Sequence, residues 1–128
     1  MNYVDYFVMP VPEANMDAYK KQAKLSAKVW IDNGALQYFE GVADDAPEGK
    51  VTDFYRAVKR KEGETVVVGY AVYKNRKHRD EVMKKTMADP RMANAMKDMP
   101  FDGKRMFWGG FKGLVEAENK AASMAAAK

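Results

Sequence analysis

The stretch MPFDGKRMFWGGF, residues 99–111, predicts a turn that leads into a strand rich in aromatic side chains. Its Asp-Gly pair is typical of turns, and the aromatic residues after that pair favour a strand over residues 105–115. Successive side chains of a strand point to opposite faces, so Trp108 and its neighbour Phe107 lie on opposite sides. This strand is therefore expected to be apolar on both of its faces.

A second stretch, TVVVGYAVY at residues 65–73, predicts another strand with the same property. It is apolar at almost every position, with Val68 and Tyr70 on one face and Val67 and Ala71 on the other. A sheet that is apolar on both faces needs a cover on each side.

Hydrophobic periodicity and turn residues divide the rest of the chain into alternating strands and helices. The main strands are expected at residues 3–11, 35–44, 65–73 and 105–115, with a short extra strand at 54–59, and the helices at 16–33 and 75–88, with a short helical piece up to residue 97. The order β-α-β-β-α-β is that of an α+β, ferredoxin-like domain with a four-stranded antiparallel sheet. We expect this domain to span residues 1–117, followed by an alanine-rich C-terminal tail at 118–128.

Two helices can cover only one face of such a sheet. The best candidate for the second cover is another copy of the same sheet, which predicts a two-fold homodimer.

Composition excludes several classes of protein. The chain has 128 residues, a net charge of +4 and no cysteine, so disulfides and thiolate zinc sites are excluded. Basic and acidic residues are mixed along the chain, which argues against a nucleic-acid interface. No long apolar run or secretory signal is present, so no membrane association is expected, and we interpret the chain as cytoplasmic. Without a metal-ligand or phosphate-binding motif, we expect no metal and no cofactor.

Three side chains are candidates for acid–base chemistry: His78, Asp5 and Glu40. His78 is the only histidine and lies in the first turn of a predicted helix, where the macrodipole disfavours its charged form. A neutral imidazole acts either as a base or as a structural hydrogen-bond partner. Asp5 and Glu40 interrupt apolar strands, so they form either a polar patch inside a cavity, with Arg105 or Lys112 as counter-charge, or a solvated edge.

Trp108, Arg105 and Tyr38 are the candidates for ligand binding. Trp108 precedes two glycines, and glycines within a strand indicate a bulge or the close approach of another group. That group is either a small aromatic ligand or simply a facing core side chain. The methionines clustered at residues 83–99 are interpreted as adaptable core filling.

Several motifs in the same order resemble the YbaA-like family of small bacterial proteins, a domain of unknown function. They are FVMPVP (7–12), KVWIDNGAL (28–36), VADD (42–45), GKVTDF (49–54), KHRDEV (77–82), MADPRM (87–92) and MPFDGKRMFWGGF (99–111). The resemblance implies a dimeric α+β barrel and brings no accepted activity with it.

Two classes of function stay open. The first is a homodimeric binding or housekeeping protein without chemistry. The second is a cofactor-free enzyme, oxygenase-like or isomerase-like, that acts on a small aromatic or acidic metabolite. A continuous pocket that joins the candidate side chains would favour the enzyme.

Overall fold

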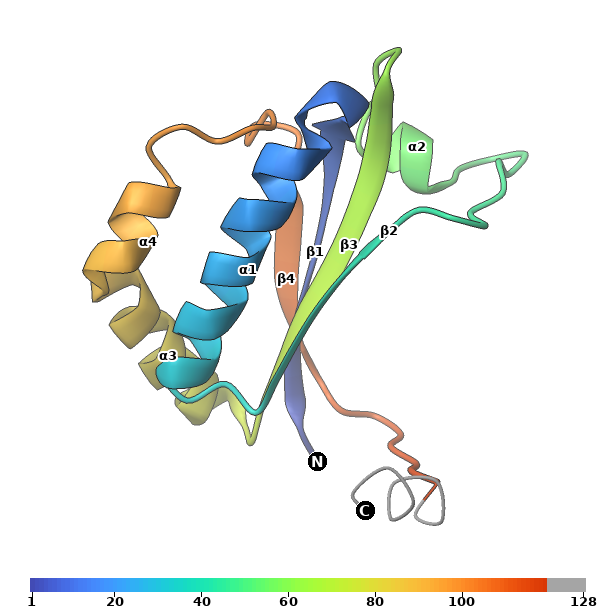
Figure 1. Cartoon of the computed structure of the whole chain (residues 1–128). Helices are drawn as coiled ribbons and strands as arrows, with labels where there is room; N and C mark the ends of the chain where they lie inside the picture. Colours follow the sequence, from blue (N-terminus) through green and yellow to red (C-terminus); the bar gives the residue numbers. More distant parts are fainter. Residues whose placement is uncertain (120–128) are drawn as a thin grey trace.

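The computed structural model describes residues 1–119, in which one β-sheet packs against a layer of helices (Figure 1). The elements in chain order are β1 (Tyr3–Pro12), a 3-10 turn (Glu13–Asn15), α1 (Met16–Asp32), β2 (Gln37–Val42), α2 (Phe54–Ala57), β3 (Glu64–Tyr73), α3 (Arg76–Ala88), α4 (Pro90–Ala95) and β4 (Phe107–Lys112).

The four strands pair antiparallel in the order β2-β3-β1-β4. This is the ferredoxin-like order, so the predicted fold is confirmed. β3 and β1 are the central strands, and they are joined along their whole length from Tyr3 opposite Tyr73 to Pro12 opposite Glu64. β1, from the first half of the β-α-β-β-α-β motif, therefore pairs with β3, from the second half, in the middle of the sheet.

The extra strand expected at residues 54–59 is not formed, and residues 54–57 form the short helix α2 instead. The Asp53 side chain accepts a hydrogen bond from the backbone N–H of Arg56 at 2.8 Å, which is the geometry of a helix N-cap. The aromatic pair Phe54-Tyr55 suggests a strand by propensity alone, and the cap outweighs that preference. α2 contacts β3 and lies on the side of the sheet away from α1 (Figure 1).

β1 continues through Pro10 and Pro12, although prolines usually end strands. The N–H of Glu13 donates to the carbonyl of Gly63, the residue just before β3. Backbone N–H groups alternate between the two sides of a strand, so those at even positions of β1 point to the β4 side. β4 pairs with β1 only up to Val8. The two prolines therefore lack an N–H where no partner strand is present, which is the place where a sheet tolerates them.

The two faces of the sheet have different surroundings. On the face below α1, α3 and α4, side chains such as Met9, Val11 and Tyr73 are buried. On the opposite face, Tyr6, Phe39, Phe107 and Phe111 are about half exposed and lie side by side in the register of the strands. The sheet is therefore apolar on both faces, as predicted, and within residues 1–119 the helices α1, α3 and α4 cover one of them.

Within residues 1–119, no helix is long and apolar enough to cross a membrane. The predicted tail at residues 118–128 lies almost wholly outside the described residues.

Candidate functional site

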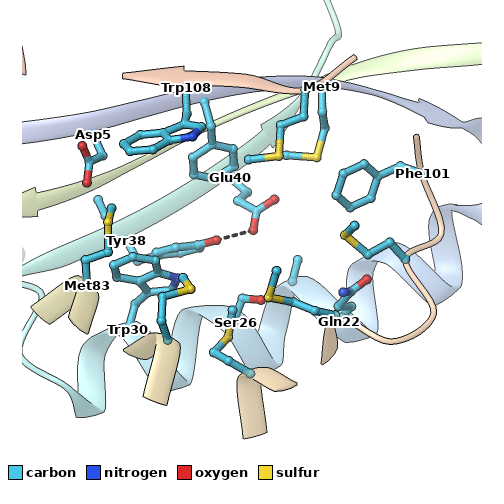
Figure 2. Close-up of a pocket in the computed structure, with 18 of the residues that line it drawn as sticks. Asp5, Met9, Gln22, Ser26, Trp30, Tyr38, Glu40, Met83, Phe101 and Trp108 are labelled. Atoms are coloured by element: carbon cyan, nitrogen blue, oxygen red, sulfur yellow. Dashed lines mark hydrogen bonds between the residues drawn. The ribbon is translucent and has the colours of Figure 1, made fainter. Parts of the chain in front are cut away.

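A cavity of about 380 Å³ lies between the sheet and the helices (Figure 2). Its floor is the covered face of the sheet, where Asp5 of β1 and Tyr38 of β2 both lie opposite the small residue Ala71 of β3. α1 supplies one wall through Gln22, Ser26 and other side chains of its inner face. α3, α4 and the chain that follows them supply the other wall.

Methionine and aromatic side chains make up most of the lining. Among residues 1–119, seven methionines face the cavity, namely Met9, Met83, Met87, Met92, Met96, Met99 and Met106. The aromatic residues are Phe7, Tyr19, Trp30, Tyr38, Tyr73, Phe101 and Trp108. Methionine is flexible and polarisable, and it makes favourable contacts with aromatic rings. The lining therefore suits an apolar occupant of adaptable shape.

Glu40 projects from β2 into the space between the sheet and the helices, where two tyrosine hydroxyls bind its carboxylate (Figure 2). Tyr38 donates to Oε2 at 2.6 Å, and Tyr19 of α1 donates to Oε1. Burial, together with the neighbouring carboxylate, raises the pKa of both Tyr19 and Tyr38. Both hydroxyls therefore stay protonated and act as donors to Glu40.

Asp5 lies near Trp108 at another part of the cavity and is almost fully buried. Its Oδ1 lies 3.4 Å from Nε of Arg79, an ion-pair distance without the geometry of a hydrogen bond. Burial raises the pKa of the Asp5 carboxyl, and the Arg79 guanidinium and the Tyr73 hydroxyl only partly oppose that effect. Asp5 is therefore a carboxyl group whose ionised form is disfavoured.

Arg79 reaches Asp5 because β4 has a glycine at the right position. The Arg79 guanidinium donates to the Tyr3 hydroxyl at 3.0 Å and lies over the rings of Tyr3 and Trp108. A Cβ atom on Gly110 would collide with both the Tyr3 hydroxyl and the guanidinium. The Gly-Gly pair that marks this strand in the sequence thus makes room for an arginine and a tyrosine.

Asp5 and Glu40 do not act as one pair. They lie two strands apart and are offset by two residues along β3, because Asp5 is opposite Ala71 whereas Glu40 is opposite Gly69. Strand spacing and rise place their Cα atoms about 12 Å apart. The carboxyl groups therefore serve two different parts of the cavity.

Comparison with known proteins identifies the family of the chain. A family model described as "Protein of unknown function (DUF1428)" matches residues 2–103. The chain belongs to the DUF1428 family. It is 46% identical over 116 residues to the uncharacterized protein YbaA of Escherichia coli (strain K12) and equally to that of Shigella flexneri, and the match covers 91% of this chain and 99% of either relative. The resemblance stated from the motifs is therefore confirmed.

A solved structure supports the fold of this DUF1428 protein. The structure of Rv0793 from Mycobacterium tuberculosis superimposes with a TM-score of 0.54 at 12% sequence identity, over 92% of this chain and 100% of that one.

Four of the six candidate residues meet at the cavity, and two do not. Asp5, Glu40, Tyr38 and Trp108 line it. His78 lies outside it, where Nδ1 accepts the backbone N–H of Lys74 at 3.0 Å and the ring contacts Tyr73 edge-on. In this DUF1428 protein His78 thus closes the first turn of α3, which is the structural alternative considered from the sequence.

Arg105 is not the counter-charge of either carboxylate in the cavity. Its guanidinium donates to both carboxylate oxygens of Glu64 at 2.6 Å and to Asp102 at 3.0 Å. It therefore joins the loop before β4 to the start of β3. Arg79 takes the expected position beside Asp5 instead.

Several residues in or beside the cavity of this protein were not predicted as part of a site. Tyr19 and Trp30 lie on the inner face of α1 and have helical spacing, but that pattern does not distinguish a packed core from a cavity wall. Arg79 belonged to a run of basic residues whose other members are exposed. Its position three residues before Val82 and seven before Thr86, the buried residues of α3, was the available signal, because that spacing places Arg79 on the covered face of the helix. No group of three or more potential metal ligands is found in residues 1–119.

Proposed function

We propose that the protein is a homodimer in which each protomer binds a small, largely apolar molecule in the cavity between sheet and helices. The observation that carries the binding proposal is the cavity itself, whose 380 Å³ falls within the usual range for ligand sites. A lining of methionine and aromatic side chains with a few convergent polar groups is also typical of such sites.

A neutral, polarity-sensitive fluorophore such as N-phenyl-1-naphthylamine tests binding in the cavity. We expect saturable binding with enhanced emission. Ser26→Phe, which places a ring in the cavity from the inner face of α1, should weaken binding at least tenfold. Lys24→Phe on the exposed side of the same helix is the matched control and should change the dissociation constant less than twofold. Equal binding by both variants would contradict the proposal.

The uncovered face of the sheet supports the homodimer. Tyr6, Phe39, Phe107 and Phe111 present adjoining half-exposed aromatic surface, and β-branched side chains of β1 and β3 lie between them. A contiguous apolar patch of this kind is rare on a monomer. A second copy related by a two-fold axis presents the same surface and covers it.

Sedimentation equilibrium tests this dimer. We expect a mass of twice 14.5 kDa at micromolar concentration. Phe39→Lys should shift the distribution towards monomer, because it places a charge on the apolar face that the second copy would cover. Ile31→Lys, at a similarly exposed apolar residue on the helix side, should remain dimeric. A wild-type mass of one chain would overturn the dimer without affecting the cavity.

A second candidate function is a proton-transfer, isomerase-like activity, and Asp5 is the observation that favours it. A buried carboxyl with a raised pKa, next to a guanidinium and facing a ligand cavity, suits a general acid or base. The test is deuterium exchange at the carbon next to the carbonyl of small aromatic ketones in D₂O. Exchange that the protein accelerates and Asp5→Asn abolishes would support this activity.

A further inference from the structure

The charged side chains that line the cavity all have the same sign. They are Asp5 and Glu40, and among the described residues no lysine, arginine or histidine faces the cavity with them. Arg79 compensates Asp5 from outside the lining. The net character of the cavity wall is therefore negative, and Glu40 is the source of that charge.

Glu40 lacks a cationic partner. In residues 1–119, no basic group lies within ion-pair distance of its carboxylate, whereas Asp5, Asp32, Glu64, Asp89 and Asp102 each have one. Its two hydrogen bonds come from tyrosine hydroxyls, which carry no charge. A carboxylate has acceptor positions for about four donors, so Glu40 still offers room for about two more.

Gln22 adds an acceptor to the same cavity. Its Nε2 donates to the backbone carbonyl of Ala95, and a carbonyl can be satisfied only by the amide nitrogen, so this bond fixes the orientation of the amide. The opposite atom, Oε1, is buried and has no hydrogen-bond partner among the described residues. A buried acceptor without a donor is costly unless an occupant of the cavity supplies one.

The aromatic lining is also suited to positive charge. Aromatic faces attract cations within about 6 Å of the ring centre. In this molecule the Arg79 guanidinium already lies 5.8 Å from the centre of the Trp108 ring. Trp30 and Tyr38 present further rings to the cavity beside Glu40 (Figure 2).

We propose that the ligand of this cavity is an organic amine, whose protonated amino group pairs with Glu40 and whose aromatic or alkyl body lies against the methionines. This inference rests on the proposed binding function and adds the charge of the ligand. It excludes carboxylate-bearing metabolites, because their charge would face Glu40 with no basic side chain in the lining to compensate it. The acidic metabolites considered from the sequence therefore do not fit, whereas the aromatic ones do if they carry an amine.

Three probes share the same apolar body and differ in the charge of their polar group: 4-phenylbutylamine, 4-phenylbutanol and 4-phenylbutanoate. Differences in their affinities therefore report the effect of ligand charge. Isothermal titration calorimetry at pH 7 should show the amine binding at least tenfold more tightly than the alcohol, with the acid weakest. Glu40→Gln should reduce the affinity for the amine to that for the alcohol. Glu81→Gln, which removes the same charge from an exposed position of α3, is the matched control and should leave the order unchanged.

Each other outcome has a definite meaning. If all three probes bind equally, or the acid binds best, the amine assignment is wrong while apolar binding in the cavity stands. If none binds at millimolar concentration, the proposed binding function fails together with the inference. A preference for the amine that persists in Glu40→Gln would show that another group selects the charge. The chemical shift of the Glu40 side-chain carboxyl carbon in the wild-type protein gives an independent readout, since it should move with the amine and not with the alcohol.

Discussion

At the scale of single residues, Asp5 and Arg79 show how one carboxyl group is placed in an apolar wall. Asp5 is 6% exposed, and Arg79 approaches it closely but without a well-aligned hydrogen bond. Burial therefore outweighs the attraction of the guanidinium, and the pKa of Asp5 stays raised. The cavity gains a titratable group at the cost of some stability.

The raised pKa of Asp5 predicts an unusual pH dependence. The folded protein holds this proton at pH values where the unfolded chain, with a pKa near 3.8, has already released it. The free energy of unfolding therefore falls as the pH rises from 3.8 through the raised pKa, and it stops falling above that raised pKa. Asp5→Asn should lack this fall and be at least as stable as wild type at pH 7, as measured by urea denaturation between pH 3.5 and 7. A wild type that gains stability relative to Asp5→Asn over that range would show that Arg79 dominates.

At the scale of elements, Arg105 anchors the loop that leads into β4. It binds Glu64 at the start of β3, Asp102 within its own loop and the backbone carbonyl of Lys59. The Arg105 hydrogen bonds lower the pKa of Glu64, and burial opposes them only partly. β4 pairs with β1 alone, so this contact supplies a second attachment for the C-terminal part of the sheet.

Arg105→Met should lower the melting temperature by several degrees, because it leaves the buried Glu64 carboxylate without its partner. The effect should be largest above pH 4.5, where wild-type Glu64 is ionised, and should shrink as the pH falls and that carboxylate is protonated. Arg76→Met, at an exposed arginine of α3, is the matched control and should change the melting temperature little. Equal effects of the two substitutions would contradict the anchoring role.

Most elements could be predicted from sequence because local and tertiary preferences agree in them. β3 is apolar on both faces and rich in β-branched residues, and α3 is capped by Asn75, whose side chain accepts the N–H of His78. The clearest error is the short strand expected at residues 54–59, where the Asp53 cap makes a helix of residues 54–57. The strand expected at residues 3–11 is β1, which ends one residue later, at Pro12.

At the scale of the whole molecule, the cavity exists because the side chains of the sheet and of the helices do not fill the space between them. Asp5, Tyr38, Glu40 and Trp108 could be predicted as candidates because polar or glycine-flanked positions in apolar strands are conspicuous. Their common site could not be predicted, because it depends on register across the strands of the sheet. The exclusion of His78 and Arg105 depends on the tertiary contacts of α3 and of the loop before β4, which the sequence pattern does not give either. The cavity itself could not be predicted from the sequence, since methionine occurs both in packed cores and in the walls of cavities.

The proposed dimer makes a prediction about the stability of the whole molecule. If unfolding is coupled to dissociation, the urea midpoint should rise with protein concentration between about 1 and 100 μM. Phe39→Lys should abolish this dependence, whereas Ile31→Lys should retain it. A wild-type midpoint that is independent of concentration would mean that the protomers fold and unfold without each other.

The methionine lining also determines how the protein responds to oxidants. Met87, Met96 and Met99 are about half exposed, so peroxide in solution reaches their sulfur atoms before those of the buried Met9 and Met92. Conversion of a thioether to a sulfoxide places a strong dipole where the site offers mostly apolar contacts. Oxidation of these three side chains would therefore make part of the cavity wall polar while the sheet beneath it stays intact. Mass spectrometry of peroxide-treated protein should find sulfoxide at Met87, Met96 and Met99 before it appears at Met9 and Met92, with loss of fluorophore binding before loss of fold.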